Sequence, residues 1–167
     1  ADVFAAVEPV IRGVFDEFSD KKIDQEFVQI PYAVSMLKYG NDKPDVRIPF
    51  EICDVTEIFR GSDFAIFAKN IEKGAVVRAV PGPKCGSRAI ADRMNSWAQE
   101  QGAPGMGYII YAEGEARGPV AKALGTEKVE AIRLAAGVED GDAVFFACAD
   151  ADDCLLYTSD AADDIPR

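Results

Sequence analysis

The chain has 167 residues, of which 49% are hydrophobic and 28% charged, and its net charge is −11 with a pI near 4.4. This composition is typical of a folded globular domain and not of a disordered chain. The negative charge argues against autonomous nucleic-acid binding, which usually requires a basic surface, although a local contact through a few Lys or Arg side chains stays open. Because there is no histidine, histidine-based acid–base catalysis and catalytic triads are excluded.

Targeting and metal-binding patterns are also missing from the sequence. No apolar run approaches the roughly 20 residues that cross a bilayer, and no signal-peptide pattern is visible, so we expect a cytoplasmic protein with no membrane partner. The four cysteines show no C-x-x-C spacing, which disfavours a zinc site and indicates reduced thiols. They are Cys53, Cys85, Cys148 and Cys154.

The N-terminal part predicts two helices. Apolar side chains recur at helical spacing over residues 2–18, at Val3, Phe4, Val7, Ile11, Val14, Phe15 and Phe18. An isolated helix cannot bury such a face, so we expect it to be poorly covered within this chain while residues 50–150 pack as a unit. A short extended piece at 27–30 is closed by Pro31, and a second helix is expected from Tyr32 to Lys38.

Residues 39–47 form a predicted stop-and-turn between two segments of different character. Gly40 can adopt the left-handed conformation that ends a helix. The side chains of Asn41 and Asp42 can bond nearby backbone amides. Pro44 favours an extended conformation at the preceding residue.

From residue 48 onward the pattern mixes strands with helices. Strands are predicted at 51–54, 64–68, 75–80, 106–112 and 143–147, with a hairpin joining 64–68 to 75–80. Helices are predicted at 56–59, from the N-cap Ser87 to about Gly102, from Pro119, and over 126–136 with Gly137 after it. Strands and helices alternate irregularly, which predicts an α+β layered fold with a mainly antiparallel sheet.

No segment of the sequence carries a recognisable catalytic, ATP-binding or metal-binding set. Residues 82–87 open a helix but lack the P-loop spacing, and Pro83 removes a backbone amide. The Gly105–Gly107 stretch predicts close backbone packing, and Asp140 with Asp142 lacks the twelve-residue calcium loop. We therefore predict no catalytic, substrate-binding, ATP-binding or metal-ligating residue in this chain.

One weak candidate for binding is a small cationic patch. Arg88 and Arg93 lie off the apolar face of their predicted helix, and Lys84 is nearby in the preceding loop. A solvated surface is the competing interpretation of the same residues. Residues 154–167 follow no earlier pattern, and the run from Cys154 to Asp163 looks like translated sequencing adapter, so we treat 151–167 as a non-native tail.

The junction carries a resemblance to a known family. Tyr32, Ala33 and Met36, followed by residues 39–47, resemble the pattern Y-A-x-x-M-x-x-Y-G-S-D-K-P-D-x-R of bacterial-type aspartyl-tRNA synthetase, a class II enzyme. Asn41 and Val46 depart mildly from the usual Ser and Leu. The GAD insertion domain of that family, which is shared with the B subunit of the tRNA-dependent amidotransferase, is similar to residues 54–59, 64–68, 77–82, 118–122 and 140–146.

The resemblance implies three segments: 1–49 from the edge of the catalytic domain, 50–150 as the GAD domain, and the tail. It implies a parent enzyme that uses ATP and Mg²⁺ to attach aspartate to tRNA and works as a homodimer. The family's ATP- and aspartate-contacting residues lie outside the matched positions, so this piece is expected to be inert and to hold no cofactor. Two alternatives stay open: a free-standing GAD-type module that associates with tRNA or another partner, and a small unrelated enzyme.

Overall fold

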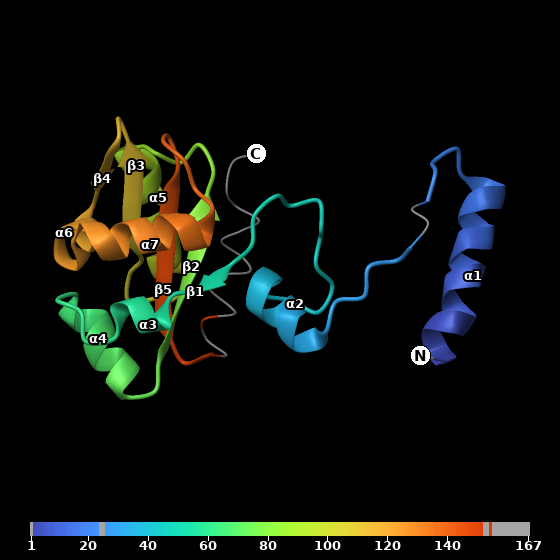
Figure 1. The fold of residues 1–167 in the computed structure, drawn as a ribbon, viewed down its shortest axis with the longest axis horizontal. Coiled ribbons are helices and arrows are strands. Elements are labelled where there is room, and N and C mark those ends of the chain that lie inside the picture. The colour runs from blue at the N-terminus through green and yellow to red at the C-terminus, as the bar shows by residue number, and fades with distance from the viewer. Residues whose placement is uncertain (1, 24–25, 152–153, 155–167) are drawn as a thin grey trace. The chain divides into compact units, whose positions relative to one another are not determined.

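The computed structural model describes residues 2–23, 26–151 and 154, and it divides into two compact units, Ala1–Pro31 and Tyr32–Arg167 (Figure 1). The first unit contains α1 (Asp2–Phe18), which confirms the first predicted helix. Within the described residues of this unit its apolar face is largely exposed: Val3 and Phe18 are 71% and 75% exposed, and even Ile11 is 39% exposed. That this face is poorly covered in the whole chain stays a prediction. Phe27 is not in a regular strand, and its ring lies 4.7 Å from the Arg12 guanidinium.

The second unit is built on a five-stranded sheet in which every pairing is antiparallel. The strand order is β1-β2-β5-β3-β4. The strands are β1 (Cys53–Asp54), β2 (Val76–Gly82), β3 (Gly107–Ala112), β4 (Glu115–Arg117) and β5 (Ala143–Ala149). The predicted α+β fold with an antiparallel sheet is therefore confirmed.

Helices cover both faces of this sheet, as Figure 1 shows, and give two apolar cores. Strand β5 serves both cores, because alternate side chains of a strand point to opposite faces. Val144 and Phe146 enter the first core, whereas Ala143 and Phe145 enter the second. The first core also takes side chains from α3 (Thr56–Phe59), α4 (Ala65–Glu72), α6 (Pro119–Leu124) and α7 (Thr126–Ala136); the second takes them from α5 (Arg88–Glu100).

The prediction of a strand at 64–68 is wrong, because these residues begin the helix α4. Phe67 and Ile71 are buried in the first core with Phe64 packed against it, and this i, i+3, i+7 spacing belongs to one face of a helix. Ile66, between them in sequence, is 67% exposed. The predicted hairpin is consequently also wrong, and β2 pairs with β1 and β5 instead.

The sequence reasoning also missed β4, which forms a tight hairpin with β3. The two connecting residues, Glu113 and Gly114, have φ angles of 57° and 74°. Two consecutive positive φ angles are the signature of a type I′ turn, whose twist matches that of the flanking strands. The other predicted elements are confirmed with small shifts at their ends, and Gly137 ends α7 in the left-handed conformation.

Most of the backbone and hydrogen-bond features predicted for the turn at 39–47 are found. The turn follows α2 (Tyr32–Tyr39), Gly40 has a φ of 74°, and the Asn41 side chain accepts a 2.7 Å hydrogen bond from the Lys43 amide. Asp42 behaves differently, since its carboxylate lies 2.7 Å from the Lys43 ammonium. Asp45 closes the second turn by accepting from the backbone amide of Arg47 at 3.0 Å and from its guanidinium at 2.8 and 2.7 Å.

Contacts across the junction join the end of α2 to the residues just before β1. The Ile52 amide donates to the Lys38 carbonyl at 2.8 Å, and the Lys38 ammonium pairs with Glu51 at 2.8 Å. The predicted division at residues 49 and 50 stays a prediction, and the predicted tail lies outside the described residues except at 151 and 154. No helix among the described residues is long and apolar enough to cross a membrane.

Candidate functional site

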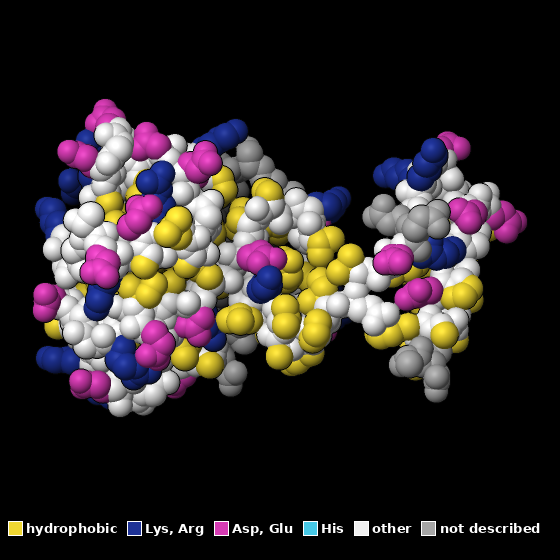
Figure 2. All heavy atoms as spheres, in the orientation of Figure 1, with side chains coloured by type: hydrophobic (Ala, Val, Ile, Leu, Met, Phe, Trp, Pro, Cys, Tyr) yellow, Lys and Arg dark blue, Asp and Glu magenta, His cyan; other side chains and the backbone are white. Residues whose placement is uncertain are grey.

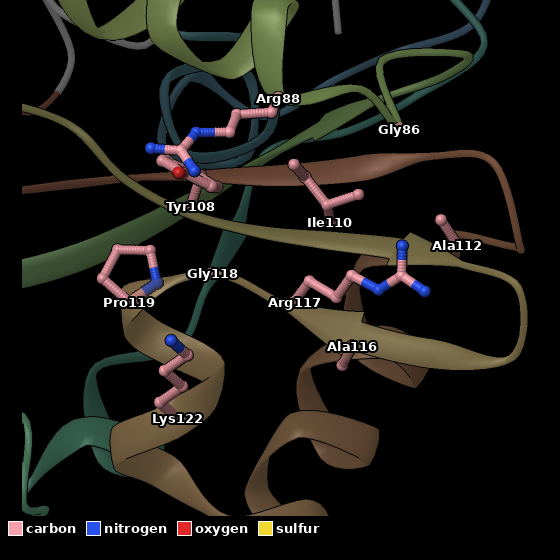
Figure 3. Close-up of a pocket in the computed structure, with 10 residues that line it drawn as sticks. All are labelled: Gly86, Arg88, Tyr108, Ile110, Ala112, Ala116, Arg117, Gly118, Pro119 and Lys122. Carbon is pink, nitrogen blue, oxygen red and sulfur yellow. The ribbon is translucent and has the colours of Figure 1, made fainter.

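A pocket of about 800 Å³ lies beside the β3–β4 hairpin, between the start of α5 and the start of α6 (Figure 3). Residues from the loop before α5, from α5 itself, from both hairpin strands and from the first turn of α6 surround it. They are Gly86, Arg88, Tyr108, Ile110, Ala112, Ala116, Arg117, Gly118, Pro119 and Lys122. The pocket therefore gathers segments that are distant in sequence.

Two glycines let the backbone close around this pocket. The Gly86 amide donates to the Gly141 carbonyl at 2.9 Å, and a Cβ atom at Gly86 would lie 2.4 Å from that same oxygen. Gly118 has a φ of 129°, and a Cβ atom there would lie 2.7 Å from the Tyr108 carbonyl oxygen. Any larger residue at either position would force the backbone apart and change the shape of the pocket.

The charged side chains that line the pocket are all basic. Arg88, Arg117 and Lys122 come from α5, β4 and α6, and Figure 3 shows their charged ends around the hairpin. Arg88 lies 3.6 Å from Asp92 in an exposed pair, which contributes little to stability. Arg117 is held more closely, at 2.6 Å from Glu113 and 3.3 Å from Glu115.

The predicted cationic patch is found only in part. Arg88 lines the pocket, but Arg93 and Lys84 are not among its lining residues. The sequence reasoning missed Arg117, Lys122 and the aromatic Tyr108. Arg117 and Lys122 flank the Gly118-Pro119 helix start in the sequence, and this pattern could have indicated them as candidates. Their proximity to Arg88 could not be predicted, because it depends on the hairpin that was missed.

The two aspartates that were considered for calcium bind backbone amides instead. Asp140 accepts from the amides of the β3–β4 turn, at 3.2 Å from Glu113 and 2.9 Å from Gly114. Asp142 accepts from the Lys84 amide at 2.8 Å and the Glu139 amide at 2.9 Å. Among the described residues no group of three or more Cys, Asp or Glu side chains could hold a metal ion.

Two further details of the predicted turns are confirmed. The Ser87 hydroxyl caps α5 by accepting from an amide one turn along, at 3.4 Å. Gly107 packs closely against the first core, because a Cβ atom there would lie 3.1 Å from Val120 and 3.2 Å from Phe67.

Cys53, Cys85 and Cys148 form no disulfide among the described residues, and they lie in or against the two apolar cores. Burial raises the pKa of Cys53 to about 11, and it raises the pKa of Cys85 and of Cys148 as well. Since the thiolate is the reactive form, these groups are poorly suited to nucleophilic chemistry at neutral pH.

The chain is similar to bacterial aspartate–tRNA ligases over most of its length. Over 152 residues the chain is 56% identical to the aspartate–tRNA(Asp/Asn) ligase of Paracoccus denitrificans. The aligned region covers 87% of this chain and 26% of that ligase. The ligase of the same name from Rickettsia bellii is 52% identical over 150 residues, covering 87% and 25%. The chain thus spans about a quarter of the length of these relatives. The GAD domain family matches residues 67–157, more than half of the chain, and the chain belongs to that family.

Proposed function

We propose that this chain is an internal segment of an aspartate–tRNA ligase that carries the enzyme's GAD domain. The observation that carries the proposal is the identity of more than half over about 150 residues with ligases of which the chain covers only 25–26%. The segment by itself holds no catalytic set and is inert. The parent enzyme attaches aspartate to tRNA with ATP and Mg²⁺, acts as a homodimer, and works in the cytoplasm.

The exposed apolar surfaces support an origin in a larger protein. Phe4, Val14 and Phe15 on α1 are 44–51% exposed, and Tyr32 on α2 is 69% exposed. Figure 2 shows hydrophobic side chains on the surface of both helices. Such faces require a partner surface, because burying a large apolar side chain contributes roughly 1.5–3 kcal/mol. In the parent enzyme the rest of the catalytic domain supplies this partner.

The tRNA substrate follows from the same relatives. The names of these ligases include both tRNA(Asp) and tRNA(Asn). We therefore propose that the parent is non-discriminating and aspartylates both tRNAs. Charging of purified tRNA(Asp) and tRNA(Asn) transcripts by the product of the uninterrupted gene tests this, and charging of tRNA(Asp) alone would contradict it.

The inert state of the segment has its own test. Aspartate-dependent exchange of pyrophosphate into ATP, measured with the purified 167-residue chain, is expected to equal the rate without protein. Measurable exchange that disappears when aspartate is omitted would overturn the proposal.

A free-standing GAD-type module is the second candidate, because Tyr32–Arg167 already forms one compact unit. Such a module would associate with tRNA or another partner, as the resemblance to the amidotransferase B subunit suggests. Sequencing the uninterrupted gene separates the two: a stop codon soon after residue 153 supports the module, and an open frame that continues supports the ligase.

A further inference from the structure

We propose that the pocket beside the β3–β4 hairpin binds phosphate groups of an RNA backbone. Its lining contains Arg88, Arg117 and Lys122 and no carboxylate, although the whole chain has a net charge of −11. Lys and Arg are the side chains that neutralise backbone phosphates. The identification of that RNA as tRNA rests on the proposed function, whereas the phosphate contact itself does not.

Lys122 is the most available of the three cations. Among residues 2–23, 26–151 and 154 it forms no ion pair with a carboxylate, and it is exposed to solvent. Arg88 is also available, since its 3.6 Å pair with Asp92 is long and exposed. Exposed pairs of this kind contribute about 0–1 kcal/mol, so a phosphate can replace the carboxylate at little cost.

Arg117 is the restrained member of the set. Glu113 and Glu115 hold its guanidinium and partly neutralise it. Both glutamates are themselves highly exposed, with side chains 78% and 71% accessible. Removing their charge should therefore free Arg117 for phosphate and strengthen binding, which is the opposite of the effect expected if these pairs serve only stability.

The size and apolar part of the pocket favour a nucleotide chain over an isolated anion. Tyr108 is half-buried and Ile110 and Pro119 add apolar surface beside the cations (Figure 3). Aromatic side chains next to basic ones are the usual combination for single-stranded nucleic acid, where bases stack and phosphates pair. Because the rest of the chain repels phosphate, the isolated contact should be weak, with a Kd above about 0.1 mM.

The test uses the ¹⁵N-labelled 167-residue chain titrated with a six-nucleotide single-stranded RNA at low salt, followed by NMR. Backbone amide signals of the pocket residues Gly86, Tyr108 and Gly118 should shift with a common Kd. Lys122→Ala should weaken binding about five-fold and reduce the salt dependence by about one phosphate contact. Lys69→Ala, on the exposed side of α4 and outside the pocket lining, is the matched control and should change the Kd less than two-fold.

A second pair of variants lies on one helix. Arg88→Ala should weaken RNA binding, whereas Arg93→Ala, on the same helix but outside the pocket lining, should not. The double variant Glu113→Gln, Glu115→Gln should bind RNA more tightly than the wild type. Unfolding curves followed by Trp97 fluorescence verify that each variant is folded.

Four results would overturn the proposal: no shift of pocket amides at millimolar RNA, equal losses for pocket and control variants, weaker binding after the glutamate substitutions, or displacement of the RNA by an equal concentration of inorganic phosphate or ATP. None of these readouts involves aspartate activation. The pocket can therefore fail while the ligase assignment holds, or hold while that assignment fails.

Discussion

Asp142→Ala should destabilise the second unit by about 2 kcal/mol. The carboxylate joins two segments far apart in sequence, the loop before α5 and the turn before β5, by accepting from the amides of Lys84 and Glu139 at 2.8 and 2.9 Å. A hydrogen bond to a charged group contributes about 1.5–3 kcal/mol when buried, and this partly exposed site reduces the value for each bond to about 1 kcal/mol. The two bonds together give the predicted loss.

Urea unfolding followed by Trp97 fluorescence measures this loss. Trp97 is the only tryptophan and lies in α5, so the signal reports on the second unit. A thermal unfolding curve followed by the same fluorescence should show a melting temperature about 4–8 °C lower. Asp150→Ala removes an exposed aspartate just after β5 and is the control, with an expected change below about 0.5 kcal/mol. If Asp142→Ala is no more destabilising than Asp150→Ala, the two loop contacts do not hold the fold as described.

Three further predictions concern the first core and its edge. Phe67→Ala should cost about 3–5 kcal/mol and Ile66→Ala less than about 1 kcal/mol in the same urea experiment, because only the first is buried; similar losses would argue against the helix α4. Burial opposes ionisation of Asp54, but hydrogen bonds from Thr56 and the Arg78 guanidinium together outweigh it and lower its pKa. The contribution of Asp54 to stability is therefore present above the unfolded value near 3.8 and is lost as the pH falls through the folded value. Asp54→Asn should thus be less stable than the wild type at pH 6 and approach it below pH 3, and a constant difference would refute this. Cys53 is half-buried and has a pKa of about 11, so it should react with a disulfide reagent at pH 8 far more slowly in the folded than in the unfolded chain, and equal rates would contradict this shielding.

Elements with strong local signals could be predicted from the sequence. The regular spacing of apolar residues predicted α1. Ser87 as an N-cap, followed by apolar residues at helical spacing, predicted α5. Gly137 marked the end of α7 because a left-handed residue is needed there. In each case the information lies within a few residues of the element itself.

Elements that depend on tertiary context were missed. The run Phe-Ala-Ile-Phe-Ala at 64–68 satisfies a strand pattern when it is taken alone, and only the burial of Ile71 one turn later shows the helical face. All three residues of the short β4 are exposed, so the strand has no apolar pattern that would indicate it. The turn before it has Glu113 at a position where Asn or Asp is more usual. Because that hairpin was missed, Arg117 and Lys122 could not be placed beside Arg88, and the pocket could not be predicted.

Aspartate-dependent pyrophosphate exchange by the product of the uninterrupted gene tests the central claim most directly. The account predicts ATP formation from pyrophosphate that requires aspartate and Mg²⁺, together with no exchange by the 167-residue chain under the same conditions. A full-length product that folds but shows no exchange with aspartate would contradict the assignment of this chain to an aspartate–tRNA ligase.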